Sequence, residues 1–482
     1  MYDLRPVGYV IGLLVLVLGV TMLVPLAADL YYQNGHWWVF FESSVLTILA
    51  GAFLALACFN GVDQRLTIQQ TFLLTTGVWL ALPLFGALPF VLGEGGERFV
   101  DAMFESMSGL TTTGSTVFRE LDLRPEGILL WRGMLQWFGG IGIIVVAMVF
   151  LPELRVGGMQ IFRSEGFDTF GKILPRAGQI AQQISVIYVG LTGTCALAYT
   201  ALGMGGFDAI VHAMTTIATG GFSTTDDSFG AFRGAPEYVA ALFMILASLP
   251  FVRYVQMVAG SARPLILDSQ VRAYLGTILL VVAFFTLYRV AADGTGLERS
   301  LREAVFNVTS IISGTGYAST DYQLWGGIAV VVFFFIGLIG GCAGSTACSI
   351  KVFRYQLLMA SISTQLRRLY APHGVFEPRY EGRKVSEEVL SSVMAFFVMF
   401  FVSLGVVAIL LGLTGLDFVT SVSGAATALA NIGPGLGAEI GPAGTFTDLN
   451  DTAKWILTMA MLVGRLELMA VFVLFTAQFW RG

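Results

Sequence analysis

The feature that most constrains this chain is its series of long apolar segments. A helix needs about 20 predominantly apolar residues to cross a bilayer, and ten segments of this 482-residue chain are long enough. Charged residues make up only 12% of the chain, whereas soluble domains contain about 25%. We therefore expect an all-α membrane protein. The ten predicted spans are 7–28, 38–61, 69–93, 126–151, 182–203, 236–260, 272–292, 325–350, 389–413 and 452–479.

Lysine and arginine are divided unevenly between the two sides of these spans. With the N-terminus placed in the cytoplasm, seventeen lie in inner loops or at inner helix ends, eight lie outside, and Arg132 and Arg465 fall within spans. This bias predicts a multi-pass protein of the cell inner (cytoplasmic) membrane with both termini in the cytoplasm. The first apolar run is longer than the 7–15 residues or so of a signal-peptide core, so we interpret it as a span rather than a cleaved leader.

Four outer connections share one pattern, in which an acidic residue precedes a glycine at a similar distance. They read "DAMFESMSGLTTTG", "DAIVHAMTTIATGG", "EAVFNVTSIISGTG" and "DFVTSVSGAATALANIG". The separation is 13 residues in the first three and 16 in the fourth. A recurrence this long indicates repeated domain-sized units. The acids are Asp101, Asp208, Glu303 and Asp417, and the glycines are Gly114, Gly221, Gly316 and Gly433.

Each acid is expected to cap a short half-helix, and the residues after it leave helical geometry. Non-helical backbone at membrane depth survives where it is buried or lines a wet cavity. Rings of carbonyl oxygens can replace the hydration shell of a monovalent cation, so we predict an ion filter; four unrelated re-entrant loops, or glycines used only for helix packing, are the alternatives. The predicted filter residues are Thr111, Thr112, Thr113 and Gly114; Ala218, Thr219, Gly220 and Gly221; Ser313, Gly314, Thr315 and Gly316; and Ala430, Asn431, Ile432 and Gly433.

The span 325–350 contains a run of small residues that weakens a helix. We expect a broken helix whose middle forms a loop in the cavity, although a small-residue packing face is the alternative. Arg465 lies in the last span, where a cation is costly, and we expect it to hold this loop through loop carbonyls, unless it serves only the fold. Arg132 and Arg253 lie nearer span ends and are expected to extend toward the surface. The predicted gating residues are Gly340, Gly341, Cys342, Ala343, Gly344, Ser345, Thr346 and Arg465.

The segments "SGLTTTG", "TGGFSTTD", "SGTGYAST" and "NIGPGLG", with "LPELRVGGMQIFR", "GGCAGSTACSIKVFR" and "VGRLE", resemble the TrkH/TrkG/KtrB superfamily of potassium transporters. Two extra N-terminal helices are similar to those of the TrkH-like branch. The resemblance implies four membrane-pore-membrane repeats around a pseudo-fourfold pore. The implied units are 1–68 (two extra helices), 69–165, 166–265, 266–372 with the gating loop, and 373–482.

The same resemblance implies a homodimer, a cytosolic TrkA-like nucleotide-binding regulatory ring, and bound potassium with no organic cofactor. Basic stretches 153–181 and 351–388 are candidate docking surfaces, although from charge alone ordinary positive-inside charge is the favoured explanation. "GFDTFGKI" (166–173) lacks the Ser or Thr of a phosphate-binding loop and no apolar strand precedes it. The potassium ligands are expected at Thr112, Thr113, Thr219, Gly220, Gly314, Thr315, Asn431 and Ile432.

Potassium uptake is therefore the leading functional hypothesis. A sodium- or proton-coupled symporter is the alternative, although coupled transporters commonly use inverted repeats, whereas these repeats share one orientation. An intramembrane enzyme would need a convergent nucleophile and base, and neither Cys342 nor Cys348 has a histidine near it in sequence. We expect no enzyme activity and no nucleic-acid partner; membrane lipid surrounds the spans.

Overall fold

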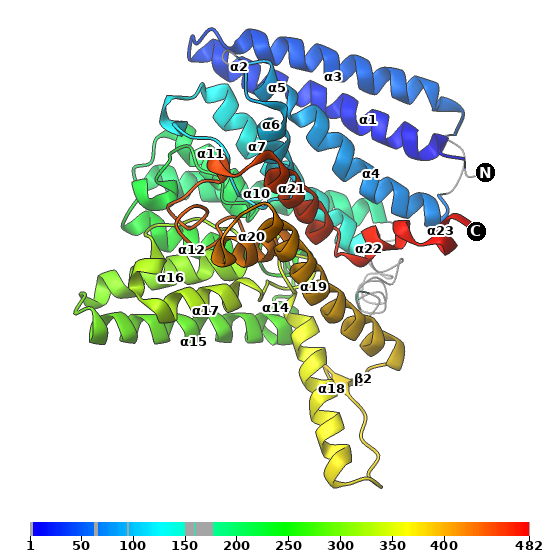
Figure 1. Cartoon of the computed structure of the whole chain (residues 1–482), viewed down its shortest axis with the longest axis vertical. Coiled ribbons are helices and arrows are strands. Elements are labelled where there is room, and N and C mark those ends of the chain that lie inside the picture. The colour runs from blue at the N-terminus through cyan, green and yellow to red at the C-terminus, as the bar shows by residue number, and fades with distance from the viewer. Residues whose placement is uncertain (1–2, 62–65, 94–95, 150–158, 160–176, 482) are drawn as a thin grey trace.

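The computed structural model describes residues 3–61, 66–93, 96–149, 159 and 177–481, and these fold almost entirely as helices (Figure 1). The first half contains α1 (Arg5–Thr21), α2 (Leu23–Tyr31), α3 (Trp37–Ala57), α4 (Ile68–Gly86), α5 (Leu88–Val91), α6 (Phe99–Leu110), α7 (Glu126–Val149), α10 (Ala177–Ala201), α11 (Gly206–Ile217), α12 (Ala235–Ala247) and α13 (Phe251–Val258). The second half contains α14 (Arg263–Leu267), α15 (Ser269–Ala292), α16 (Leu297–Ser313), α17 (Gly327–Gly337), α18 (Val352–Tyr370), β1 (Arg379–Tyr380), β2 (Arg383–Lys384), α19 (Glu387–Leu413), α20 (Phe418–Ala430), α21 (Asp451–Arg465), α22 (Met469–Phe472) and α23 (Ala477–Arg481). Short 3₁₀ turns join them at Phe59–Gly61, Leu121–Leu123, Ser228–Ala231, Tyr322–Trp325, Phe446–Asp448 and Val473–Phe475.

Seven of the helical stretches in the described residues are long and apolar enough to cross a membrane. Two further predicted spans are sharply bent. The span predicted over 236–260 turns by 90° between α12 and α13, at Pro250, which cannot continue a helical hydrogen-bond ladder. The last span turns by 103° after α21, where Glu467 and Leu468 both have positive φ. The tenth, predicted over 325–350, is helical only through α17.

A fourfold pattern of packing organises the centre of the molecule. The half-helices α6, α11, α16 and α20 each pack between the two spans that flank them in sequence. Each also contacts the second span of the preceding repeat: α6 contacts α21, α11 contacts α7, α16 contacts α12, and α20 contacts α17. Since the fourth repeat contacts the first, the pattern closes on itself. The all-α fold with four membrane-pore-membrane repeats is therefore confirmed.

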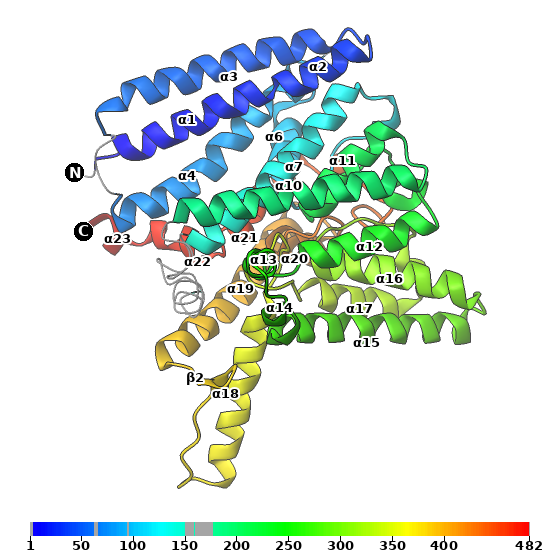
Figure 2. The ribbon, with the colours of Figure 1, turned by 180° about the vertical axis from the view of Figure 1, so that it is seen from behind.

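The two extra N-terminal helices form a hairpin along one side of this assembly (Figure 2). Glycine lets α1 and α3 approach closely: a Cβ added at Gly12 would lie 2.5 Å from the Ala55 backbone nitrogen. Small residues commonly mediate such close helix contacts in membranes. The two chain ends lie on the same side of the molecule (Figure 1).

The sequence predicts that the acids of the repeat pattern cap their half-helices, but in the structure not all of them do. Asp417 is an N-cap, accepting from the backbone nitrogens of Val419 and Thr420. Asp101 and Asp208 instead lie within the first turns of α6 and α11. Glu303 lies well inside α16, where it accepts from Arg289 at 2.6 Å and Arg299 at 2.8 Å. The capping prediction is therefore correct only for the fourth repeat.

The prediction that Arg132 extends to the surface is wrong. Its side chain is 1% exposed, and its Nε donates to Glu105 Oε1 over 2.8 Å. Its Nη1 also donates to the Ser223 carbonyl at 2.7 Å, so the pair joins α6 of the first repeat to the loop that follows α11. Removing one member of a buried pair leaves the other uncompensated. Arg253 differs, since its side chain is 21% exposed and pairs with Asp268.

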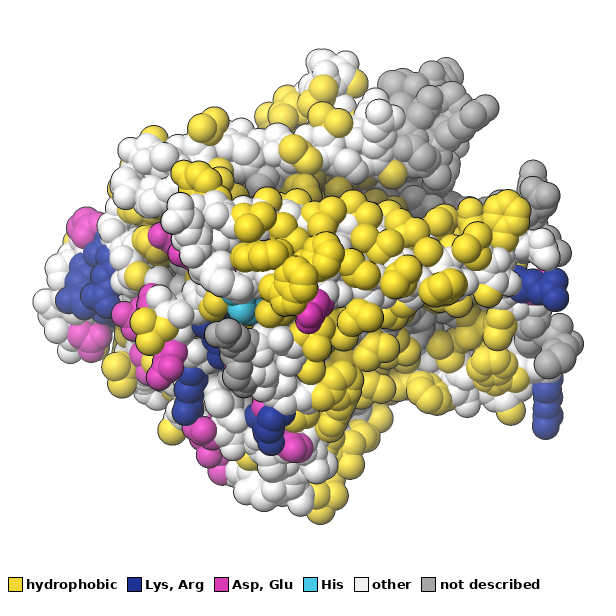
Figure 3. Space-filling model, turned by 90° about the horizontal axis from the view of Figure 1, so that it is seen from above, with side chains coloured by type: hydrophobic (Ala, Val, Ile, Leu, Met, Phe, Trp, Pro, Cys, Tyr) yellow, Lys and Arg dark blue, Asp and Glu magenta, His cyan; other side chains and the backbone are white. Residues whose placement is uncertain are grey.

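Hydrophobic side chains cover the middle of the face seen in Figure 3, and charged side chains gather toward its ends. This distribution suits a molecule surrounded by lipid at its waist. The helix α18 and the β1–β2 hairpin project away from the rest of the structure (Figure 1). In that projection Lys384 donates to Glu377 at 2.5 Å, and this hydrogen bond lowers the pKa of the Glu377 carboxyl.

We predict that Glu105→Gln strongly destabilises the protein, because it leaves the buried Arg132 guanidinium without a counter-charge. The expected cost is about 3–5 kcal/mol, read as a lower midpoint of thermal unfolding in detergent. Arg98→Gln is the control: Arg98 pairs with Asp101, but its side chain is 59% exposed, and exposed ion pairs contribute little, so its unfolding midpoint should stay close to that of the parent. Equal midpoints for Glu105→Gln and the parent would contradict the structural role given to this pair.

Candidate functional site

The four predicted filter segments come together at the ends of the four half-helices. Each segment begins at the last residue of its helix or directly after it, and each has the same backbone signature. The second residue has positive φ in every repeat: Thr112 (52°), Thr219 (51°), Gly314 (78°) and Asn431 (52°). The fourth does too: Gly114 (86°), Gly221 (80°), Gly316 (81°) and Gly433 (104°). The common geometry favours one ring over four unrelated loops.

The glycines show how tightly the segments fit. A Cβ added at Gly114 would lie 2.0 Å from the Gly220 carbonyl oxygen. At Gly221 it would lie 1.9 Å from the Thr315 oxygen, and at Gly316 it would lie 1.9 Å from the Ile432 oxygen. At Gly433 it would lie 3.0 Å from the Thr113 oxygen, which returns to the first repeat. The third-position carbonyls therefore form a closed ring, which we call the carbonyl ring: Thr113, Gly220, Thr315 and Ile432.

Side chains of the filter segments form hydrogen bonds with one another, both within and between the repeats. The Thr111 and Thr113 hydroxyls lie 2.7 Å apart, and the Ser313 and Thr315 hydroxyls are paired at the same distance. Between repeats, Asn431 Nδ2 donates to Thr113 Oγ1 at 2.9 Å. These contacts bring the predicted filter residues into one cluster. Such rings can substitute for water around a monovalent cation.

The run predicted to break the span 325–350 is a buried non-helical loop, which we call the inner loop (Gly340–Ser349). Its backbone is anchored to a neighbouring repeat, since the Cys342 nitrogen donates to the Ser248 carbonyl at 3.0 Å. At its other end, the Ser349 nitrogen donates to the Ala430 carbonyl at 2.9 Å. The predicted gating residues Gly340 through Thr346 all lie in this loop.

Cys348, which the sequence analysis left out of the gating residues, is an inner-loop side chain that contacts the filter segments, as Ser349 also does through its hydroxyl bond to the Ala430 carbonyl at 3.3 Å. Its Sγ lies 3.5 Å from Thr112 Oγ1. A Cβ added at Gly314 would lie 2.9 Å from Cys348 Cβ. The loop therefore closes against the second positions of two segments. No sequence signal distinguished this cysteine from the small residues around it.

Arg465 does contact the inner loop, but differently from the prediction. Its Nη1 lies 2.9 Å from Cys348 Sγ, and its Nη2 donates to the Gly139 carbonyl of α7 at 3.2 Å. The predicted bonds to loop carbonyls are absent from the contacts of the described residues, and Arg465 bonds to the Cys348 thiol of the loop instead. Arg465 is 4% exposed, and its Nε has no hydrogen-bond partner in the described part of the chain.

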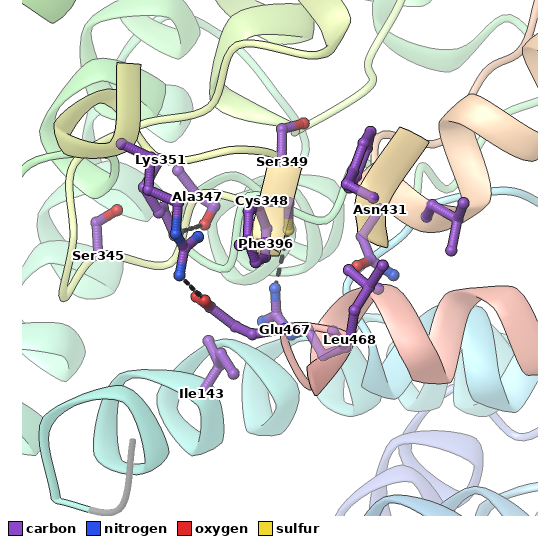
Figure 4. Close-up of a pocket in the computed structure, with 15 residues that line it drawn as sticks. Ile143, Ser345, Ala347, Cys348, Ser349, Lys351, Phe396, Asn431, Glu467 and Leu468 are labelled. Atoms are coloured by element: carbon purple, nitrogen blue, oxygen red, sulfur yellow. Dashed lines mark hydrogen bonds and ion pairs between the residues drawn. The ribbon is translucent and has the colours of Figure 1, made fainter. Parts of the chain in front are cut away.

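Beside Arg465 is a small cavity bordered by the inner loop, α19 and the bend after α21 (Figure 4). Lys351 and Glu467 border it together with Cys348. Lys351 donates to the Ala347 carbonyl, and Glu467 pairs with Arg354. The volume of about 30 Å³ suits one or two water-sized particles, which is too little for a fully hydrated cation. Three cations and one carboxylate therefore surround a narrow space.

The sequence analysis also missed Gln136 of α7. Its Nε2 donates to the Gly220 carbonyl at 2.7 Å, and its Oε1 accepts from the Phe222 nitrogen at 3.0 Å. A polar residue inside an apolar span was the available signal. The phosphate-loop-like stretch 166–173, the first basic stretch up to residue 176 apart from Met159, and the boundary at 165/166 lie outside the described residues.

Comparison with known proteins matches this architecture over the whole chain. Residues 36–481 match the family described as "TrkH: Cation transport protein". The chain is 44% identical to the Trk system potassium uptake protein TrkI of Halomonas elongata, covering 99% of this chain and 97% of that protein. It is 36% identical to the Trk system potassium uptake protein TrkH of Escherichia coli, covering 99% of both.

A solved structure gives the same result for the fold. The crystal structure of the potassium transporter TrkH from Vibrio parahaemolyticus superposes with a TM-score of 0.91, at 33% identity and with complete coverage of both chains. With its carbonyl ring, its inner loop and these relatives, the chain belongs to the TrkH family of cation transport proteins.

Proposed function

We propose that this protein takes up potassium across the inner membrane through the carbonyl ring, with the inner loop as its gate. The closed backbone-to-backbone contact of four glycines with four carbonyls supports this most directly. Relatives over the whole length are named potassium uptake proteins, which are transporters and not enzymes. The repeat boundaries given above, 69–165, 166–265, 266–372 and 373–482, are part of the proposal.

In this proposal a potassium ion exchanges its hydration shell for oxygen atoms of the second and third positions. The carbonyl ring supplies one set of ligands, and the residues before it, Thr112, Thr219, Gly314 and Asn431, supply the next. The residues at these positions are buried, and the glycines that follow them leave no room for a Cβ. The oxygens are therefore held at fixed spacing. A held ring can discriminate between cations by size or by the field of its dipoles.

The inner loop would obstruct the path on the other side of the ring. Cys348 contacts Thr112 of the filter, and the Arg465 guanidinium bonds to the Cys348 thiol. The guanidinium also adds positive charge where a potassium ion must pass. At short range in a medium of low dielectric constant, repulsion between two cations is strong. Opening would therefore require the loop and Arg465 to move apart.

Coupling to sodium or protons is the alternative to channel-like flux. Intramembrane carboxylates are typical of coupled carriers. The carboxylate that borders the cavity, Glu467, is paired with Arg354, and this pairing gives coupling no specific support. Potassium flux into liposomes, with sodium and pH gradients imposed separately, distinguishes the two. Flux that follows the potassium gradient alone supports the channel-like proposal.

The proposal includes a homodimer and a cytosolic TrkA-like nucleotide-binding regulator. The proposal of a regulator rests on the resemblance and on relatives named as parts of a Trk system.

For the dimer, the projecting α18 offers an apolar stripe formed by four exposed residues, Met359, Ile362, Leu366 and Leu369. Their spacing places them on one helix face. In an isologous contact the same surface of both copies meets. Two apolar stripes can pack against each other in this way, whereas Arg367 and Arg368 of one copy would repel the same arginines of the other.

We predict that alanine at the four glycines lowers the ratio of potassium to sodium permeability, in a graded order. Gly221→Ala and Gly316→Ala should be most severe, because a Cβ there would lie 1.9 Å from a ring carbonyl, and Gly433→Ala should be mildest at 3.0 Å. All four also force an L-residue into positive φ. Gly276→Ala in α15 is the control, since a Cβ there meets nothing within 4 Å. Unchanged ratios in all four variants would refute the filter assignment.

We predict that Arg465→Ala raises basal potassium flux per folded protein, because it removes both the hold on Cys348 and a positive charge. Arg465→Lys should be intermediate, since lysine keeps the charge but loses the planar fork of donors. Arg289→Ala, which removes a buried cation paired with Glu303 instead, is the control and should not raise flux. If Arg465→Ala transports no faster than the parent in liposomes, the gating role is wrong.

For the dimer we predict that Ile362→Glu with Leu366→Glu halves the mass measured by light scattering in detergent. Two carboxylates on the apolar stripe would repel those of the other copy and cost their desolvation. Gln365→Glu places a charge on the same helix beside the stripe and should leave the mass unchanged. A dimer that survives the double substitution would show that α18 is not the contact.

A further inference from the structure

The second repeat differs from the first and third at the carbonyl ring. Thr113 and Thr315 carry hydroxyls that bond to a hydroxyl two residues earlier, each over 2.7 Å. Gly220 occupies the equivalent position and has no side chain with which to do so. The second segment therefore lacks this hydroxyl contact, as does the fourth, which has Ile432 at this position.

Gln136 of α7 supports the second segment. Its side chain is fully buried and brackets Gly221: Nε2 donates to the Gly220 carbonyl at 2.7 Å, and Oε1 accepts from the Phe222 nitrogen at 3.0 Å. A Cβ added at Gly220 would lie 2.3 Å from Gln136 Cδ. The amide thus fills the space of the missing side chain, and the two residues form a matched pair.

Gly220 O is also the ring carbonyl that faces Gly114. A carbonyl oxygen has two lone pairs, so it can accept from Gln136 and still face the ion path. Among the described residues, no side-chain donor reaches the other three ring carbonyls, those of Thr113, Thr315 and Ile432. The second repeat is therefore the place where an α7 side chain controls the position of a ring oxygen directly.

We propose that Gln136 is a specificity-determining residue that positions the second filter segment for potassium. The inference rests on the function proposed above. The Gln136 amide prevents the Gly220 carbonyl from turning away or moving inward, and so opposes contraction of the ring around the smaller sodium ion. It acts through the backbone of the second segment and does not itself contact the ion.

The test is the ratio of potassium to sodium flux in liposomes, which does not depend on the amount of folded protein. Gln136→Leu removes both hydrogen bonds, and Gln136→Glu keeps the acceptor for Phe222 but loses the donor to Gly220. Both should lower the ratio by about fivefold or more, the factor that corresponds to one net buried hydrogen bond. Retention of the parent ratio by both variants would overturn the inference.

A rescue separates positioning from mere stability. Gly220→Thr alone should lower the ratio, because the new side chain collides with Gln136. Combined with Gln136→Ala, Gly220→Thr restores the chemistry of the first and third repeats in a vacated space, and the ratio should exceed that of Gln136→Ala alone. A double variant no better than Gln136→Ala would contradict the matched pair.

Two controls complete the design. Gln70→Leu removes a different buried glutamine, which caps α4 and donates to the Asp3 carbonyl, and it should leave the ratio unchanged. Gly433→Ala reports on the filter itself. If Gly433→Ala lowers the ratio and the Gln136 variants do not, Gln136 has no role and the proposed function stands. If neither changes the ratio, both proposals fail.

Discussion

The structure depends on one steric constraint: the four repeats meet backbone to backbone, with no room for a Cβ at the point of contact. Gly114, Gly221 and Gly316 each place an α-carbon where a methyl group would lie 2.0 Å or less from the next carbonyl. Such an approach requires helices that end together at one depth and spans that hold them there. The cyclic packing of α6, α11, α16 and α20 against the preceding repeat provides this.

The buried arginines on the two sides of that contact differ in their partners. On the outer side, buried arginines are paired with carboxylates, as Arg132 is with Glu105 and Arg289 with Glu303. On the inner side, Arg354 is likewise paired with Glu467, but Arg465 contacts a thiol and a carbonyl instead of a carboxylate. A buried cation without a counter-charge is costly. Its retention beside the inner loop is easier to explain by an effect on passing cations than by stability.

The sequence predicted the repeat architecture because each repeat carries its own local signature, an acid followed by glycine after a similar interval. The same locality predicted the break after α17, where small residues weaken the helix. Prediction from the sequence failed where the role of a residue depends on partners that are distant along the chain. Arg132 is buried in an ion pair with Glu105, and Glu303 lies inside α16, where Arg289 and Arg299 pair with its carboxylate. Cys348 and Gln136 gain their positions from other repeats, which spacing along the chain does not encode.

The function proposed here requires that the carbonyl ring binds a dehydrated potassium ion. The most direct measurement is an experimental structure with potassium replaced by rubidium or thallium, in which anomalous scattering locates the cation. We expect a peak on the axis between four carbonyls, and we expect it to be lost when sodium replaces the heavy ion; these carbonyls are those of Thr113, Gly220, Thr315 and Ile432. A ring free of anomalous density, with the peak instead at a carboxylate such as Glu467, would contradict the proposed function.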